Sequence, residues 1–404
     1  MNTRKLKLLL TILTLTSFGP IHGQSSFIAT QDNNSDTDGQ IGLFTTQKTI
    51  LDSISNSDEQ EKEKRIFQIS FLPFFGTNSR GSNEITNNTS INILAGYAYG
   101  LKGFEAGGLL NIIKDSVTGV QLAGLGNLVG GDIQAVQMAG LFNIGGNNFK
   151  GTQMAGLLNW ATDSVNGGQI AGLLNASSSL EGFQTAGLLN LAPRVKGIQI
   201  AGLVNIAQET EGTQISGLIN YTKTLKGLQI GFINISDTIE QGVAIGFFNY
   251  VKHGFHQFEI SNSDAMHANL SFKTGTHEFY SILTAGYRLD DINPLWSYGY
   301  GIGRQFNFGT KLYANIEVTS QQVNTVKYWT DGLNLLNDLN LNIGVNYRKI
   351  SVNAGPVLHV NVSKSYDADS GLWGYFNPSN PIFENTGTGT NVKAWIGYRA
   401  AFRF

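Results

Sequence analysis

The sequence predicts an all-β protein, most simply an antiparallel outer-membrane β-barrel of about 20 strands in which an internal repeat supplies roughly half the strands. Three observations lead to this fold class. A tandem repeat of short alternating segments occupies residues 103–250, and strand-like segments joined by alternately short and long connections occupy 251–404. The chain also begins with an export signal, yet no later apolar run is long enough to form a membrane-spanning helix.

The repeat consists of ten copies of the pattern G-x-Q-φ-A-G-L-φ-N, seen clearly in residues 119–127, 151–159 and 197–205. A near-fixed period of 14 to 16 residues separates successive copies, so repeat architecture has to be considered before any other fold. The candidate site residues are the amides of this repeat: Gln121, Gln137, Gln153, Gln169, Gln184, Gln199, Gln214, Gln229, Asn111, Asn127, Asn143, Asn159, Asn175, Asn190, Asn205, Asn220, Asn234 and Asn249.

Each copy alternates with a period of two residues. Ile198 and Ile200 fall on one side of the pattern, and Gln199 falls on the other. With turn formers between copies, one copy is about eleven strand residues, which at about 3.3 Å per residue and about 45° of tilt cover about 26 Å, close to a bilayer's hydrocarbon thickness. In such a barrel the apolar side chains would face lipid and the amides would line the lumen.

The alternative is a parallel β-solenoid joined to a smaller C-terminal barrel, with each copy forming one rung. Stacking would align the amides as ladders and would set opposite charges side by side, because the residue before the Gly alternates in sign: Glu181, Lys196, Glu211 and Lys226. Against the solenoid, the residue after the Asn is aromatic only in even copies: Trp160, Tyr221 and Tyr250. That alternation favours strands of alternating direction whose equivalent ends reach one membrane interface.

The chain before the repeat divides into three parts. Residues 1–23 resemble a cleavable secretory signal, because Arg4, Lys5 and Lys7 precede a short apolar core. Residues 24–65 are polar and predict a flexible tether. Residues 66–102 predict the first strands, at 66–76 and 90–100.

The C-terminal part, 251–404, predicts barrel strands with long outer loops. The expected strands are 255–262, 266–273, 277–288, 295–307, 311–321, 338–347, 350–362 and 391–404. The last of them alternates cleanly and ends in Phe404, and it resembles the terminal strand recognised by the barrel-assembly machinery of Gram-negative bacteria. Phe404 is therefore the expected assembly signal.

Composition and motifs favour a non-enzymatic protein. Only 14% of residues are charged, the net charge is −2 and there is no cysteine, so neither nucleic-acid binding nor a disulfide framework is expected. His253 and His256 lie close in sequence, but scattered strand histidines explain them better than a metal site. No catalytic, cofactor-binding or metal residues are predicted. The expected partners are outer-membrane lipid, the barrel-assembly machinery and an unidentified surface ligand.

The repeat pattern resembles a bacterial surface-repeat family of outer-membrane proteins, whose members carry a signal peptide, many such copies and a terminal aromatic strand. The resemblance is strong over 103–250 and looser afterwards, and the copies depart from it at Glu105, Ala135 and Ala244. It implies location in the outer membrane and a structural or pore-forming barrel. A surface binding or adhesion protein with a solenoid repeat is the alternative function.

Overall fold

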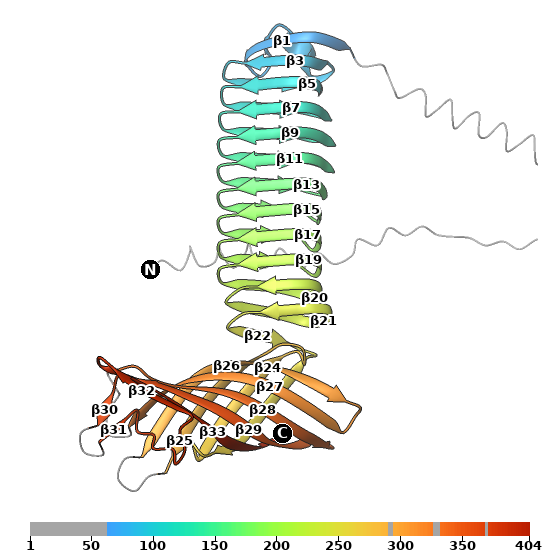
Figure 1. The fold of residues 1–404 in the computed structure, drawn as a ribbon. Coiled ribbons are helices and arrows are strands. Elements are labelled where there is room, and N and C mark those ends of the chain that lie inside the picture. The colour runs from blue at the N-terminus through green and yellow to red at the C-terminus, as the bar shows by residue number, and fades with distance from the viewer. Residues whose placement is uncertain (1–62, 290–293, 326–331, 368–370) are drawn as a thin grey trace, which may run out of the picture. The chain divides into compact units, whose positions relative to one another are not determined.

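The computed structural model of the protein describes residues 63–289, 294–325, 332–367 and 371–404 (Figure 1). The predicted signal and all but the last three residues of the predicted tether lie outside this part of the chain. The described residues are built from strands, with one short 3-10 helix, η1(Ser79–Asn83). No helix among them is long and apolar enough to cross a membrane.

The repeat forms a parallel β-solenoid of about eleven turns. Most turns contain a longer strand, a corner and a shorter strand, and the strands of successive turns are stacked one above another (Figure 1). The prediction of one antiparallel barrel of about 20 strands is therefore wrong, and its alternative is confirmed.

The longer strands are β1(Lys64–Leu72), β3(Thr86–Asn92), β5(Gly100–Gly107), β7(Val117–Ala123), β9(Ile133–Ala139), β11(Phe149–Ala155), β13(Ser164–Ala171), β15(Ser179–Ala186), β17(Arg194–Ala201) and β19(Glu209–Ser216). The shorter ones are β4(Ala95–Ala98), β6(Leu110–Ile113), β8(Gly126–Val129), β10(Phe142–Gly145), β12(Leu158–Ala161), β14(Leu174–Ala176), β16(Leu189–Leu191), β18(Val204–Ile206) and β22(Phe248–Val251), while β20(Ile219–Ile230) and β21(Ile233–Ile245) run through both positions. β2(Phe75–Gly76) instead pairs antiparallel with β1.

The corner of each turn explains why the antiparallel prediction failed. Between β17 and β18 the chain bends at Gly202 and Leu203, so one copy becomes two short strands on two faces and not a single strand of membrane length. A side chain at Gly202 would bring its Cβ within 2.1 Å of the carbonyl oxygen of Gly187 in the turn before. The second glycine of the repeat therefore marks a corner that only glycine fits.

Parallel register then follows from the repeat itself. Gln184 pairs with Gln199 and Asn190 pairs with Asn205, so every residue sits beside its equivalent in the next copy. The first glycine of the copy is constrained too: Gly197 has a φ of +139°, and a Cβ there would meet the carbonyl oxygen of Gly182 at 2.0 Å. Equivalent glycines thus let neighbouring backbones approach closely.

The strands before the repeat belong to the same solenoid. β1 pairs in parallel with β3, and β3 pairs in parallel with β5, so the solenoid extends from Lys64 to Val251. The alternation of aromatic and aliphatic residues after the Asn does not report strand direction in this fold, because these strands all run parallel. Trp160 pairs with Ile144 of the preceding turn, and Tyr221 pairs with Ile206, all within one column.

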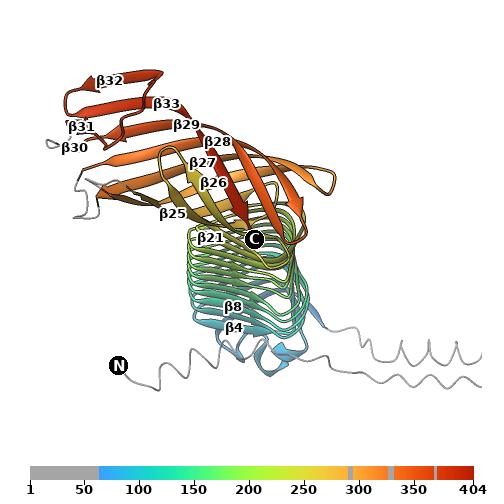
Figure 2. The ribbon, with the colours of Figure 1, turned by 90° about the horizontal axis from the view of Figure 1, so that it is seen from below.

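The C-terminal part is a closed antiparallel barrel of eight strands (Figure 2). The eight strands are β23(Phe255–Ser263), β24(Ala268–Gly275), β25(Tyr280–Arg288), β26(Leu295–Phe308), β27(Leu312–Thr325), β28(Asn334–Tyr347), β29(Ile350–Ser363) and β33(Thr390–Arg403). Pairing of β23 with β33 closes the ring, and β32(Phe383–Gly387) extends β33 at the edge. A small hairpin of β30(Tyr366–Asp367) and β31(Leu372–Trp373) lies in the longest connection. All eight strands coincide, within a few residues, with those predicted for this region.

The two ends of the barrel differ. The connections 276–279, 309–311 and 348–349 are tight, and alternation of strand direction puts them all at the end where β23 begins. We call this the short-turn end. Only three residues separate β22 from β23, so the solenoid joins the barrel there, and the chain also terminates there. Three of the four connections at the opposite end are longer, including 364–389, while 264–267 has four residues.

Candidate functional site

A column of glutamines fills one side of the solenoid interior. The Gln184 Nε2 amide donates to Gln169 Oε1 at 2.7 Å, and Gln199 Nε2 donates to Gln184 Oε1 at 2.9 Å. The same bond recurs from Gln137 to Gln229, always from one turn to the turn before it. These side chains are fully buried, because the alternation of each long strand turns its Gln inward and its apolar residues outward.

A column of asparagines fills the other side and runs in the opposite direction. Asn190 Nδ2 donates to Asn205 Oδ1 of the following turn at 3.0 Å and also to the carbonyl oxygen of Ile200 at 2.7 Å. Asn175 donates in the same way to Asn190 at 3.0 Å. Each amide therefore accepts one bond and donates others, which satisfies a polar interior closed to solvent.

Two departures from the repeat pattern, Glu105 and Ala244, mark the ends of the glutamine column. Glu105 replaces the first Gln, and its carboxylate accepts from Gln121 at 2.8 Å and from Asn92 at 2.9 Å. Burial raises the pKa of the Glu105 carboxyl above its ordinary value. Ala244 replaces the last Gln, so the glutamine column stops one turn before the barrel. The asparagine column ends where Asn249 Nδ2 donates to Ser281 Oγ of the barrel at 2.9 Å.

The predicted site residues are thus brought together as stacked ladders, as in the solenoid alternative, and not around a barrel lumen. All eighteen amides are buried, with exposed fractions of 0–1%, and they line no wet lumen. The residues that do fill the barrel are different ones, which the sequence analysis missed. Amides bonded to one another in this way offer no nucleophile or general base, so the solenoid interior is a structural element.

The lumen of the barrel contains a cluster of buried charges. Lys273 Nζ bridges two carboxylates, at 2.8 Å from Glu259 Oε2 and 2.5 Å from Glu317 Oε1. Arg399 Nη1 lies 3.0 Å from Glu317 Oε2, and Arg403 Nη2 lies 3.0 Å from Glu317 Oε1. Both arginines also contact Glu259. All five side chains are at most 9% exposed, so the cluster occupies the barrel interior.

Further polar side chains extend this filling toward both ends of the barrel. Tyr280 donates its hydroxyl to Glu317 at 2.8 Å, and His359 contacts Asp338 at 2.7 Å. The sequence held a usable signal: Glu259 alternates with Phe258 and Ile260 on one strand, which places a charge on the inner face of an apolar-walled sheet. Strand parity alone would have placed this charge inside the barrel.

The outer wall of the barrel has the reverse polarity. Its outward side chains are large, apolar and solvent-exposed, including Phe258, Ile260, Leu270, Tyr298, Ile302, Ile316, Val318, Leu341, Ile343, Val345, Val352, Ile396, Tyr398 and Phe402. Phe404 belongs to this wall. Its backbone exchanges two hydrogen bonds with Phe258, at 3.0 and 3.1 Å, and the two rings stack with centroids 6.2 Å apart. The predicted assembly signal therefore lies at the β23–β33 seam that closes the barrel.

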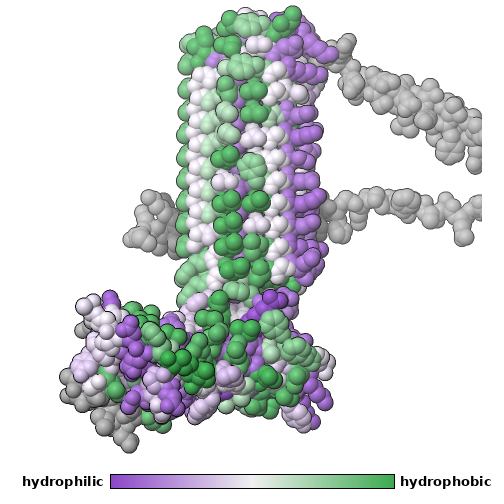
Figure 3. Space-filling view, viewed as in Figure 1, coloured by the Kyte–Doolittle hydropathy of each residue, from purple (hydrophilic) through white to green (hydrophobic). Residues whose placement is uncertain are grey.

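The exterior of the solenoid is divided along its length (Figure 3). We define the apolar edge as the column of corner residues Leu109, Leu125, Leu141, Leu157, Leu173, Leu188, Leu203, Leu218, Phe232 and Phe247, which are 37–52% exposed. We define the polar edge as the exposed column Lys102, Thr118, Gln134, Lys150, Asn166, Glu181, Lys196, Glu211, Lys226 and Glu240. Lys196 Nζ lies 3.1 Å from Glu181 Oε1, as the solenoid alternative predicted for stacked charges.

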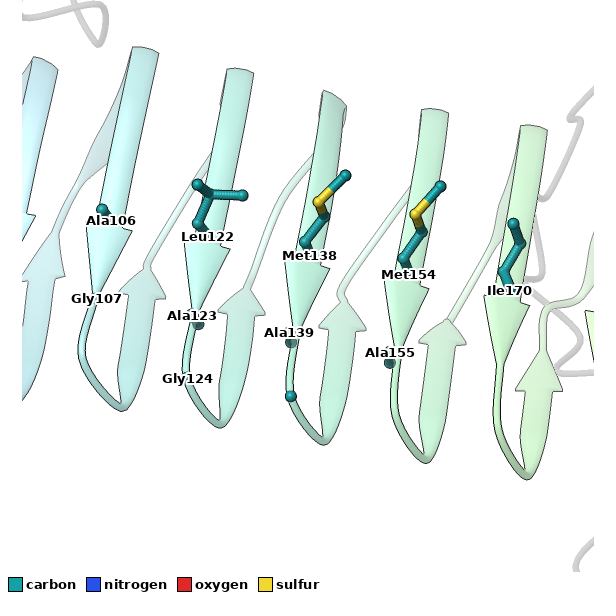
Figure 4. A pocket seen from close by; sticks show the side chains of 11 residues that line it. Ala106, Gly107, Leu122, Ala123, Gly124, Met138, Ala139, Met154, Ala155 and Ile170 are labelled. Atoms are coloured by element: carbon teal, nitrogen blue, oxygen red, sulfur yellow. The ribbon is translucent and has the colours of Figure 1, made fainter.

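A groove of about 500 Å³ runs beside the apolar edge across five successive long strands. Figure 4 shows Leu122, Met138, Met154 and Ile170 projecting in a row from neighbouring strands, above a floor of alanine and glycine. A row of flexible apolar side chains with no polar group among them can bind only apolar matter.

The remaining candidates for chemistry are not assembled. His253 Nδ1 contacts the carbonyl oxygen of Asp237 at 3.1 Å, and His256 Nε2 contacts that of Val251 at 2.6 Å. Within the part of the chain that the structure describes, no group of three or more His, Cys, Asp or Glu could hold a metal ion. Comparisons with protein-family models, with curated proteins and with solved structures return no match for this chain.

Proposed function

We propose that this protein is a non-enzymatic outer-membrane repeat protein, in which the eight-stranded barrel is the membrane anchor and the solenoid is a rigid binding scaffold attached to it. The observation that supports this most is the polarity of the barrel. Charged side chains such as Glu317 and Arg403 are buried inside, while apolar ones such as Ile343 are exposed outside. A water-soluble barrel would have the opposite arrangement, whereas lipid favours this one.

Strand length supports the same proposal. Five barrel strands, β26 to β29 and β33, contain 14 residues each. At about 3.3 Å per residue and about 45° of tilt, such strands rise about 33 Å, enough to cross the hydrocarbon core. The predicted export signal and the likeness to a bacterial surface-repeat family agree with outer-membrane location.

The two barrel ends support an orientation. Outer-membrane barrels keep short turns on the periplasmic side and long loops outside. The tight turns, the C-terminus and the solenoid are all at the short-turn end, so we place the solenoid in the periplasm and the connection 364–389 at the cell surface. This orientation favours binding inside the envelope over adhesion to another cell.

The packed lumen favours anchoring over transport. Lys273, Arg399 and Arg403 span the interior and bond the carboxylates opposite, so conduction would require this cluster to break. The purified protein should require detergent for solubility, should shift its gel mobility on boiling, and should give no steady conductance in planar bilayers. Solubility without detergent would disprove the anchor, and stable channels would restore the pore-forming function.

A further inference from the structure

The apolar edge of the solenoid is too extensive to face water. Ten corner residues at about 4.8 Å per turn make a stripe about 45 Å long. With the exposed or half-buried apolar residues on either side, such as Ile200 and Val204, the stripe forms one contiguous apolar patch, of the kind that marks an interaction site on a protein surface. A stripe of this size needs a partner that covers it.

The shape and charge of the solenoid narrow the choice of partner. The apolar side chains continue from the long strand through the corner to the short strand, as Ile200, Leu203 and Val204 do, so the stripe wraps a convex edge. A flat contact with one other protein would cover only one side of it. The polar edge, with residues such as Glu181 and Lys196, lies at the far end of the long strands. This division resembles an amphipathic helix that lies in a membrane interface with one side in lipid.

The apolar edge continues into the outer wall of the barrel. The rings of Phe232 and Phe247 stack with centroids 5.0 Å apart, and Phe247 stacks on Tyr300 of β26 at 4.7 Å. A groove of about 610 Å³ joins Phe247 to barrel-wall residues that include Leu283 and Tyr298. The groove is lined mainly by apolar side chains, so the edge and the wall that we place in lipid form a nearly continuous apolar surface.

The depth of this junction is also informative. Tyr300 lies eight residues before Phe308, the last residue of β26 at the short-turn end. Eight residues at about 3.3 Å and about 45° of tilt correspond to about 19 Å along the membrane normal, slightly more than half of a hydrocarbon core of about 30 Å. The last corner of the solenoid thus contacts the wall within the membrane-spanning belt and not at its rim.

We propose that the apolar edge of the solenoid is immersed in the hydrocarbon core of the membrane that holds the barrel, so that its occupant is lipid acyl chain, while the polar edge faces the periplasm. This inference rests on the proposed function, because it takes the barrel to be inserted. In this arrangement the solenoid is held in the membrane along its length and does not project freely from the barrel. The groove beside Met138 and Met154 then contacts acyl chains as well.

The absence of cysteine allows a direct test with single labels. Leu188→Cys places a label on the apolar edge, Glu181→Cys places one on the polar edge of the same turn, and Ile343→Cys places one on the barrel wall. Each variant of the full chain is labelled with a polarity-sensitive fluorophore and reconstituted into phosphatidylcholine vesicles with or without brominated acyl chains. We expect brominated lipid to quench the labels at 188 and 343 to a comparable extent, and the label at 181 hardly at all.

The other outcomes separate the two proposals. Quenching at 343 without quenching at 188 would overturn the immersed edge and leave the anchor intact. Quenching at neither position would overturn the anchor itself. A label at 188 that resists both brominated lipid and aqueous iodide, and that self-quenches as the labelled fraction rises, would show that a second copy of the chain covers the edge and would also overturn the inference.

Discussion

Replacement of Asn190 by Leu tests the amide columns most directly. The Leu side chain has nearly the same shape but cannot hydrogen-bond. Asn190 accepts from Asn175 at 3.0 Å, and it donates to Asn205 at 3.0 Å and to the carbonyl oxygen of Ile200 at 2.7 Å. The substitution removes these three bonds, and a longer one of 3.4 Å to the carbonyl oxygen of Gln184, from an interior position that is 0% exposed.

The size of the effect follows from the groups left behind. A buried donor or acceptor without a partner costs about 1–3 kcal/mol, so loss of the three shorter bonds alone gives about 3–9 kcal/mol. The lower half of this range applies, because Asn175 keeps a second bond to the carbonyl oxygen of Thr185 at 2.7 Å. We therefore expect the free energy of local opening to fall by about 3–5 kcal/mol.

Hydrogen exchange resolved by peptide is the suitable assay, because each turn of a solenoid contacts only its neighbours and can open separately. Faster exchange should appear in the turns around Asn190 and fade within a few turns on either side. Gln208→Leu is the matched control, since it removes an exposed amide and should change stability by less than about 0.5 kcal/mol. Equal exchange in both variants would refute the structural role of the columns.

Four further predictions concern other parts of the molecule. Because burial raises the folded-state pKa of Glu105 above its ordinary 4.5, the first turns should be most stable below pH 4.5 and lose stability as pH rises through the folded-state value; Glu105→Gln should abolish this dependence in hydrogen exchange, and a flat wild-type profile would contradict it. Gly197→Ala should destabilise its turn by about 1–3 kcal/mol or more, measured by the same exchange, and an unchanged rate would show that the left-handed backbone is not required. Glu317→Gln leaves buried cations underpaired and should cost about 3–5 kcal/mol, seen as a lower temperature for the gel-mobility shift; an unshifted temperature would mean that the cluster does not hold the barrel. On intact cells, an impermeant thiol reagent should label Leu372→Cys and not Lys349→Cys, and the reverse pattern would put the solenoid outside.

Much of this fold could be predicted from the sequence because strand alternation survives any choice of topology. The eight barrel strands and the inward amides follow from parity alone. What parity cannot give is strand direction, because a parallel rung and an antiparallel strand have the same alternating pattern. The direction depends on whether Gly202 and Leu203 continue a strand or turn a corner, and that is decided by the close approach of the neighbouring backbone at Gly187.

For the barrel interior, the local sequence was enough to predict which charged side chains face inward. Glu259 and Glu317 each alternate with apolar neighbours, and Lys273 follows Phe272, in strands that were correctly predicted. Their pairing across the lumen could not be read from the sequence, because it joins residues as distant as Glu259 and Arg403, which meet only when the barrel closes. The closing seam is therefore fixed by charge pairing as well as by backbone bonds.

The opposed directions of the two amide columns have a consequence for the length of the molecule. Every inner turn passes on one glutamine bond toward the N-terminus and one asparagine bond toward the C-terminus, while only Glu105 and Ser281 provide special endings. The side-chain dipoles of the columns oppose each other, so added turns accumulate no axial field of the kind that grows in an α-helix. Gain or loss of one copy would change the span by about 4.8 Å and leave both endings intact. The length of the solenoid can therefore change in evolution by whole turns.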